Sequence, residues 1–462
     1  MNQPAATTPT APEASLSRSL RPRHVTMITI GGIIGAGLFV SSSAAISDVG
    51  PAIVISYAIT GALVLLIMRM LGEMAVAMPQ VRSFTEFARA GLGNWAGFSV
   101  GWLYWYFWVI VIPAEAIAGA NILRDWFPNV PVWEFGVGLM AIMTGVNLMS
   151  ARSYGEFEFW FSSIKVAAII VFIAAAAAYA LGITSPHGQT FGNLTAYGGF
   201  MPKGSTAVLA AVTTVFFSLT GAEIVTIAAA ESTEPAKAVA RMTSTIVWRI
   251  LIFYVGSIFL ILCVVPWNTI KSGFSPFTHA LDSMNIPYAA TLMSAIILTA
   301  VLSCLNSAFY VASRVAFVLA ERGDAPRWLV KTNARHVPAR SVMLGCAAGL
   351  AGIGAREFWP DTVFAFLVNA SGALIVFVYM AISISQVLLR RKREAAGAPE
   401  PGLKMWLFPW ASYLAIAGMV AVLIAMGSTE AHRDELKASV VSVVVALVAY
   451  FLFRRGRQAP AA

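Results

Sequence analysis

Residues Gly31 to Phe39 read GGIIGAGLF and determine how the rest of the chain is interpreted. They place four glycines in the middle of an apolar segment, Val25 to Ser47, that is long enough to cross a membrane as a helix. An unwound backbone is tolerated inside a membrane only where it is buried in protein or lines a cavity. The half-helix after such a break directs its N–H groups and positive dipole end at the gap. The stretch therefore predicts a broken helix and a binding site for a carboxylate.

The composition is that of a membrane protein with many spans. The chain has 462 residues, of which 58% are hydrophobic and 11% charged, and its mean hydropathy is +0.75. About 12 windows reach the roughly 20 apolar residues that a transmembrane helix needs, without the alternation of a β-barrel. We therefore expect an all-α membrane protein. The expected spans are Val25 to Ser47, Ala52 to Ala77, Trp95 to Ile122, Val132 to Met149, Phe157 to Ile183, Thr206 to Ala229, Ser244 to Val265, Tyr288 to Leu319, Val342 to Ala355, Thr362 to Leu389, Met405 to Met426 and Ala438 to Phe453.

The net charge of +9 reflects topology rather than nucleic-acid binding. If the N-terminus lies in the cytoplasm, 24 of the 31 Lys and Arg residues fall in cytoplasmic segments or adjoining span ends. The positive-inside rule thus predicts two cytoplasmic termini and an even number of crossings of the plasma (inner) membrane. Residues 1–24 are rich in Ala, Pro, Ser and Thr, so we expect them to form a disordered cytoplasmic tail, and we expect residues 454–462 to form a cytoplasmic tail at the other end.

A second interruption predicts an internal repeat. Phe216 to Glu223, FFSLTGAE, brings Gly and polar residues into the sixth span. Spans one and six hold corresponding places in two sets of five, and because five is odd the second set enters from the opposite side. An inverted 5+5 repeat with both first helices broken is typical of secondary transporters. The predicted parts are a first repeat at 25–183, an inverted second repeat at 206–389, and accessory helices 11 and 12 at 405–453.

Several polar residues within the predicted spans are candidate functional residues. Lys165 lies nine residues past Glu156, about 14 Å along a helix and near mid-membrane, too deep for its ammonium to reach an interface easily. An intramembrane ionisable residue is a functional candidate by default, and Glu223 at the span-six break is another. Glu115 either lines a cavity or pairs with a polar neighbour. Asn306 either bonds to a helix break or joins two helices, and Ser371 is a further candidate for the pathway. The three cysteines, Cys263, Cys304 and Cys346, are interpreted as small core residues without a disulfide.

Five strings resemble the amino acid permeases of the amino acid/polyamine/organocation (APC) superfamily, most closely the bacterial gamma-aminobutyrate (GABA) permeases. They are RHVTMITIGGIIGAGLF, GWLYWYFWVIVIPAEA, SYGEFEFW, GAEIVTIAAAES and SCLNSAFYVASR. The similarity extends from about Arg21 to Trp410, and the YGEFEFW and GAEIVTIAAAE strings are the most specific to this family.

The resemblance implies proton symport of an amino acid by alternating access. It implies that the backbone of Gly35, Ala36 and Gly37 binds the substrate carboxylate. The carbonyl groups near Ile33 and of Phe217 and Thr220 would bind the substrate ammonium, and Phe217 would also act as an aromatic gate. Glu223 and Lys165 would couple transport to protons, with Lys165 in place of a sodium ion.

Other classes of function and other substrates remain as alternatives. A channel needs a continuous polar pore, whereas an integral-membrane enzyme needs a catalytic cluster, and the sequence contains no HExxH motif, no paired Asp/Glu motif in a span and no nucleotide-binding loop. We therefore expect a transporter rather than an enzyme, without a metal or cofactor, driven by the proton gradient and embedded in the lipid bilayer. The chain reads GAGLFVSSS where GABA permeases read GASLFVGSS, so another neutral or basic amino acid is the alternative substrate.

Overall fold

The computed structural model describes residues 34–78, 81, 84–149, 151–221, 223, 250–271, 274–360 and 363–455. The regular secondary structure of these residues is helical throughout, which agrees with the expected all-α class. The helices are α2 (Ser42–Val49), α3 (Ile53–Ala77), α4 (Phe84–Leu92), α5 (Asn94–Trp126), α6 (Val132–Met149), α7 (Ala151–Ala180), α8 (Gly204–Ala210), α9 (Val212–Leu219), α12 (Ser257–Val264), α13 (Pro276–Ser283), α14 (Ala289–Glu321), α15 (Ala339–Phe358), α16 (Val363–Ala395), α17 (Trp410–Ser428) and α18 (Glu430–Arg455). Short π- and 3₁₀-helical turns complete the list: η1 (Gly37–Ser41), η2 (Phe191–Leu194), η3 (Ile250–Gly256), η4 (Trp267–Thr269) and η5 (Arg327–Val330).

Eight helices in the described part of the chain are long and apolar enough to cross a membrane. They correspond to the second, third, fourth, fifth, eighth, tenth, eleventh and twelfth expected spans. The first, sixth and seventh expected spans correspond to shorter apolar helical stretches at Gly37–Val49, Gly204–Leu219 and Ile252–Val264. The ninth corresponds to α15, a helix of 20 residues whose glycines bring it close to its neighbours. At Gly349, for example, an added Cβ would lie 2.3 Å from Met140 and 2.7 Å from Ile112.

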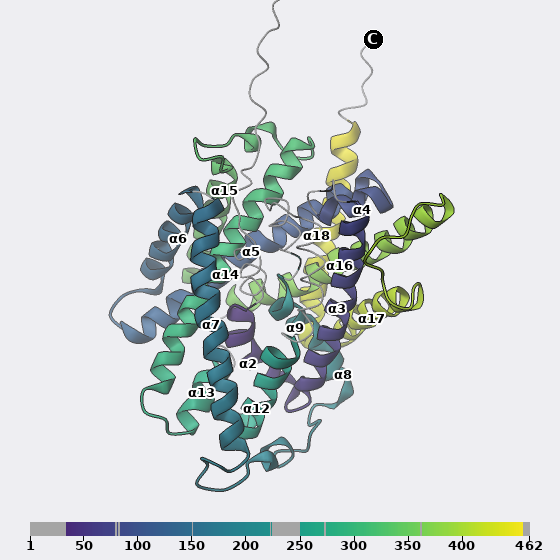
Figure 1. Ribbon diagram of the computed structural model, residues 1–462. Helices are drawn as coiled ribbons and strands as arrows, with labels where there is room; N and C mark the ends of the chain where they lie inside the picture. Colours follow the sequence, from purple (N-terminus) through teal and green to yellow (C-terminus); the bar gives the residue numbers. More distant parts are fainter. Residues whose placement is uncertain are drawn as a thin grey trace, which may run out of the picture.

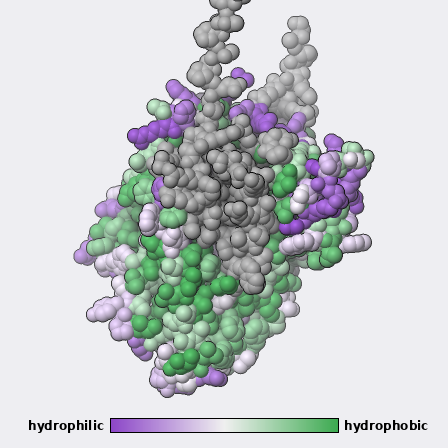
Figure 2. All heavy atoms as spheres, viewed as in Figure 1, coloured by the Kyte–Doolittle hydropathy of each residue, from purple (hydrophilic) through white to green (hydrophobic). Residues whose placement is uncertain are grey.

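Helix α5 lies at the centre of the molecule, and α18 lies at its edge. In the most apolar 18-residue stretch of each helix, 78% of the α5 residues are buried, compared with 17% of the α18 residues. Helix α5 packs against α14, α16, α15 and α6, whereas α18 contacts mainly α16, α5 and α17. In Figure 1 the short helices α2 and α9 lie in the middle of the molecule, between the long helices α7 and α3. Figure 2 shows hydrophobic residues over much of the visible face, with hydrophilic residues at its upper edge and on the projecting end of α16.

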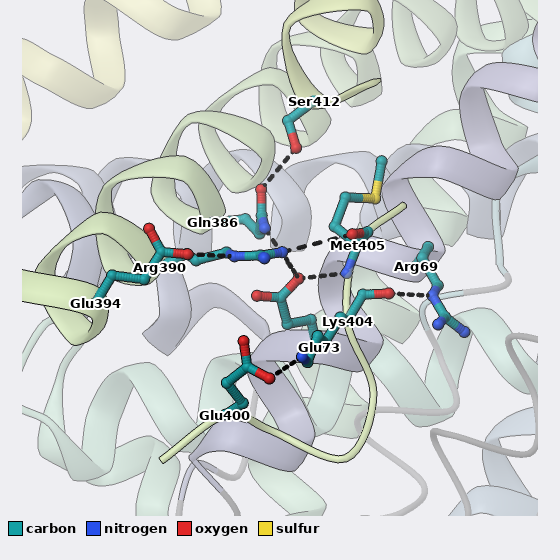
Figure 3. A network of polar contacts seen from close by, with 9 residues as sticks. All are labelled: Arg69, Glu73, Gln386, Arg390, Glu394, Glu400, Lys404, Met405 and Ser412. Carbon is teal, nitrogen blue, oxygen red and sulfur yellow. Dashed lines mark hydrogen bonds and ion pairs between the residues drawn. The ribbon is translucent and has the colours of Figure 1, made fainter. Parts of the chain in front are cut away.

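A polar network attaches the segment before α17 to α3 and α16 (Figure 3). The Glu73 carboxylate of α3 is nearly buried, and its Oε2 accepts hydrogen bonds from the backbone N–H of Met405 at 2.6 Å and from Gln386 at 3.1 Å. The Arg390 guanidinium lies 3.4 Å from the same oxygen. Arg69 donates to the carbonyl of Lys404 at 2.6 Å. These contacts explain why α17 begins at Trp410 and not at Met405, where the hydrophobic pattern placed it.

Replacing Glu73 with alanine is expected to destabilise the fold by about 3 kcal/mol, because it leaves the buried N–H of Met405 and the buried amide of Gln386 without their acceptor and removes a carboxylate that pairs with Arg390. The Glu394→Ala variant is the matched control. Glu394 pairs with the same Arg390, but its side chain is 54% exposed, so its loss is expected to cost no more than about 0.5 kcal/mol. Thermal unfolding of the purified protein in detergent compares the two. Equal midpoints would show that the network does not fasten this segment.

Candidate functional site

The described part of the first expected span begins with two non-helical residues at the predicted place, Ile34 and Gly35, which we call the first interruption. Regular winding starts with η1 at Gly37 and continues without a break through α2. The N–H of Leu38 donates to the carbonyl of Gly35 at 3.2 Å, not to Ile34, where an α-helix would direct it. The carbonyl of Ile34 is thereby available to a side chain from another helix.

The sixth expected span also loses its helical winding where predicted, and we call the described non-helical residues Thr220, Gly221 and Glu223 the second interruption. Helix α9 ends at Leu219, Thr220 is extended (φ −67°, ψ 144°), and Gly221 adopts φ +120°, a conformation that favours glycine. The N–H of Gly221 donates to Glu223 Oε2 at 3.1 Å, whereas a continuous helix would direct it to the carbonyl of Phe217. The carbonyl of Phe217 therefore lacks its helical N–H donor, and the expected binding of a substrate ammonium group requires such a carbonyl.

The two interruptions meet. Ser218 Oγ donates to the carbonyl of Gly37 at 2.7 Å. A Cβ added at Gly37 would lie only 2.7 Å from the Cα of Ser218, so no larger residue fits without moving one backbone. Glycine is needed here for this close approach.

The Gly37→Ala variant is expected to lower the uptake rate at least tenfold, because one of the two helices must shift by several tenths of an ångström. The Gly138→Ala variant on α6 is the control, since an added Cβ there meets nothing within 4 Å. Uptake of labelled substrate, normalised to protein in the membrane, compares the two. Wild-type uptake by Gly37→Ala would show that the close approach has no function.

A narrow cavity lies beside the interruptions. It is nearly closed in this conformation, with about 10 Å³ of free space, roughly enough for one water molecule, and most of its wall is apolar. Its lining residues come from both interrupted helices and from α5 and α14: Gly35, Gly37, Phe107, Trp108, Val111, Glu115, Phe217, Thr220 and Cys304. The cavity combines an apolar wall with backbone groups and one carboxylate, as expected for a small ligand with charged ends.

Glu115 lies at the start of the first half-helix. It is 1% exposed, although it is in the middle of α5, and its Oε2 accepts a hydrogen bond from the N–H of Ala36 at 3.4 Å. This bond is long, so another acceptor can displace it at small cost. The sequence left two interpretations of Glu115 open, and the structure shows it in the cavity wall.

Lys165 is completely buried and reaches the first interruption. Its Nζ donates to the carbonyl of Ile34 at 2.7 Å and to Ser303 Oγ of α14 at 2.8 Å. The ammonium is therefore enclosed by protein. Glu158 Oε1 lies 3.9 Å from the same Nζ, also at 0% exposure.

Glu223 lies at the end of the second interruption, between two tyrosines. Its Oε1 accepts from the Tyr104 hydroxyl at 2.9 Å, and its Oε2 accepts from the Tyr379 hydroxyl at 2.6 Å. The two tyrosines belong to α5 and α16, so the carboxylate connects three elements in a fully buried layer. Tyr104 is one helical turn from Phe107 and Trp108 in the cavity wall, so this layer borders the cavity.

Two other predicted site residues, Asn306 and Ser371, are not among the residues that line the cavity. Asn306 accepts a hydrogen bond from Asn147 of α6 at 2.8 Å, so it joins two helices rather than bonding to a helix break. Ser371 is buried, donates to the carbonyl of Val368 at 2.7 Å and is not among the cavity-lining residues. Ile33 lies outside the described residues.

The sequence interpretation missed several residues of the site. Cys304 was interpreted as core, but it lines the cavity, and an added Cβ at Gly35 would lie 2.7 Å from its Cβ. Phe107 and Trp108 also line the cavity; they belong to the string GWLYWYFWVIVIPAEA, from which no site residue other than Glu115 was predicted. Glu158 carried one available signal, since it precedes Lys165 by seven residues and therefore lies on the same helix face. Within the described ranges, no group of three His, Cys, Asp or Glu side chains could hold a metal ion.

Comparison with known proteins supports a transporter. A family model described as amino acid permease matches residues 24–457. A gamma-aminobutyric acid permease of Bacillus subtilis is 45% identical over 96% of this chain and 95% of its own length. One of Escherichia coli K12 is 46% identical over 91% of each chain. The aromatic amino acid transport protein AroP of Corynebacterium glutamicum is 39% identical over 88% of this chain and 90% of its own.

Solved structures support the fold. The crystal structure of a manganese transporter mutant from Eremococcus coleocola superposes with a TM-score of 0.59, covering 93% of this chain and 92% of that one at 13% sequence identity. At this identity the similarity concerns the fold alone. These relatives are permeases and transporters rather than enzymes, and the apolar helices make the chain a multi-pass membrane protein. The extent of the family match and the identity to these relatives show that the chain belongs to the amino acid permease family.

Proposed function

We propose that the protein imports GABA across the inner membrane by proton symport and alternating access. The observation that carries this proposal is the cavity between two interrupted helices, because it offers bare backbone groups of both signs within an apolar wall. The names of the most similar relatives favour GABA among amino acids.

The substrate carboxylate binds at the N-terminus of the half-helix Gly37–Val49 in this proposal. The N–H groups of Ala36 and Gly37 and the positive end of the helix dipole face this position. An incoming carboxylate displaces Glu115 from the N–H of Ala36, and the released Glu115 carboxylate is then available to the substrate ammonium. The carbonyl groups of Phe217 and Thr220, and those near Ile33, complete the ammonium site, and Phe217 acts as the gate.

The proposed architecture assigns each part of the chain a place. Residues 25–183 and 206–389 form two inverted five-helix repeats, and residues 405–453 form accessory helices. The tails at 1–24 and 454–462 are cytoplasmic, which the distribution of Lys and Arg supports. With this orientation the layer of Tyr104, Glu223 and Tyr379 lies on the cytoplasmic side of the cavity and has to open before substrate is released.

Lys165 and Glu223 are the proposed proton-coupling groups. Lys165 donates a hydrogen bond to the carbonyl of Ile34 in the first interruption, so the protonation state of Lys165 is linked to the geometry of that interruption. A lysine cation in this position performs the structural task of a bound cation and still exchanges a proton.

Labelled GABA uptake into proteoliposomes tests the proposal. We expect saturable accumulation that an imposed pH gradient (acid outside) drives and a protonophore abolishes. Competition by a panel of neutral, basic and aromatic amino acids assigns the substrate; the aromatic arm is included because Phe107, Trp108 and Phe217 line the cavity. Non-saturable flux would indicate a channel. Uptake unaffected by the gradient would contradict proton symport, and competition by other amino acids without any GABA transport would contradict the assigned substrate.

A further inference from the structure

Glu158 and Lys165 form a buried pair of opposite charges outside the substrate cavity. They are seven residues apart on α7, which is two helical turns, so both side chains project from the same face. Both are 0% exposed, with Lys165 Nζ 3.9 Å from Glu158 Oε1. Among the residues that the structure describes, Glu115 of α5 and Cys304 of α14 also lie near Lys165, and these two line the cavity, whereas Glu158 does not.

One hydroxyl group connects the pair. Ser303 Oγ accepts a hydrogen bond from Lys165 Nζ at 2.8 Å and donates one to Glu158 Oε1 at 2.6 Å. Ser162 donates to Oε1 at 3.0 Å, and Ser307 donates to Oε2 at 3.4 Å. Three hydroxyl donors surround the carboxylate, and Ser303 has the geometry of a proton relay, with a donor on one side and an acceptor on the other.

We propose that Glu158 is the group that receives the coupling proton from Lys165 through Ser303. This inference rests on the proposed function as a proton symporter. In the step, the Lys165 ammonium gives one proton to Ser303 Oγ while Ser303 gives its hydroxyl proton to Glu158 Oε1. An ammonium, a hydroxyl and a carboxylate become a neutral amine, the same hydroxyl and a neutral carboxylic acid. Charge and atoms balance, and no isolated charge is left in the buried site.

The position of Glu158 gives the step a direction. Glu158 lies about 10 Å nearer than Lys165 to the start of α7 at Ala151, which is the cytoplasmic end in the proposed topology. Buried polar residues continue the same way along α14 at three- or four-residue spacing: Ser303, Ser307, Tyr310 and Arg314. A proton passed from Lys165 to Glu158 has therefore moved away from the cavity and toward the cytoplasm.

Stability alone does not account for this pair. Taking two charges out of water costs several kcal/mol per ion, and well-packed apolar residues are often as good or better at such positions. A functional role explains why two charged groups and three serine hydroxyls occupy the interior of the bundle.

The Glu158→Gln variant, measured in proteoliposomes, tests the proposal. Wild-type protein must first show substrate accumulation driven by a pH gradient. Its absence would refute the proposed function as a proton symporter rather than the proton transfer to Glu158. We then expect Glu158→Gln to lose at least tenfold in gradient-driven accumulation and in substrate-induced proton entry, reported by an internal pH dye. Counterflow exchange of labelled for unlabelled substrate should stay within about twofold of wild type, because exchange needs no net proton transfer. Wild-type accumulation by Glu158→Gln would overturn the proposal, and so would equal loss of exchange and accumulation.

Two further variants separate coupling from folding. Glu156→Gln, two residues earlier and on a different side of α7, is the matched control and should accumulate substrate as wild type does. If Glu158→Gln is poorly folded, Glu158→Gln combined with Lys165→Met removes both charges and should recover the yield and thermal stability. This double variant should not accumulate substrate. A double variant as unstable as the single one would show that Glu158 acts independently of Lys165 and would overturn the proposal.

Discussion

Replacing Lys165 with methionine is expected to abolish gradient-driven uptake, with accumulation at least 100-fold below wild type. Methionine has a similar length but carries no charge, so the carbonyl of Ile34 and Ser303 Oγ lose their donor. The Glu158 carboxylate is also left buried without the opposite charge 3.9 Å away. Uptake of labelled GABA under an imposed pH gradient measures the effect.

Lys437 provides the matched control for this substitution. Its side chain is 66% exposed and pairs with the exposed Asp434, so Lys437→Met should leave uptake unchanged. Accumulation at the wild-type rate in Lys165→Met would remove Lys165 from the mechanism.

Replacing Glu223 with glutamine is expected to reduce uptake about 100-fold. The carboxylate accepts from Tyr104 on one oxygen and from Tyr379 and the N–H of Gly221 on the other. Glutamine replaces one acceptor by an NH₂ donor, so at least one buried hydroxyl or N–H faces another donor, at a cost of about 1–3 kcal/mol. The variant also lacks a group that can take up a proton.

Uptake as a function of external pH measures this effect, with Glu134→Gln on the exposed part of α6 as the control. Wild-type uptake with an unchanged pH dependence in Glu223→Gln would show that the tyrosine-bound carboxylate neither couples protons nor controls the cytoplasmic side.

Local sequence features predicted the two interruptions and the buried lysine. The glycines near Gly35 and the Thr-Gly pair after Leu219 lower the cost of unwinding, and Gly35, Thr220 and Gly221 are non-helical in the structure. The depth of Lys165 followed from its distance along the helix alone. The limits of α6, Val132–Met149, agree with the hydrophobic pattern to the residue.

The contacts around these residues could not be predicted in the same way, because they join distant parts of the chain. Tyr379 is 156 residues from Glu223, and no local pattern distinguishes it from other aromatic residues in apolar helices. The Asn306 amide pairs with Asn147, 159 residues away, on a helix that no local pattern distinguishes from its neighbours. The start of α17 depends on Glu73, 332 residues before Met405. Only tertiary packing determines such partners.

A structure of the protein with GABA bound tests the central claim most directly. We predict density for the ligand between the two interruptions, with its carboxylate within about 3 Å of the N–H groups of Ala36 and Gly37 and its ammonium close to Glu115 and the carbonyl groups of Phe217 and Thr220. Ligand density outside this cavity, or helices that wind continuously through Gly35 and Thr220 when the ligand is bound, would contradict the account.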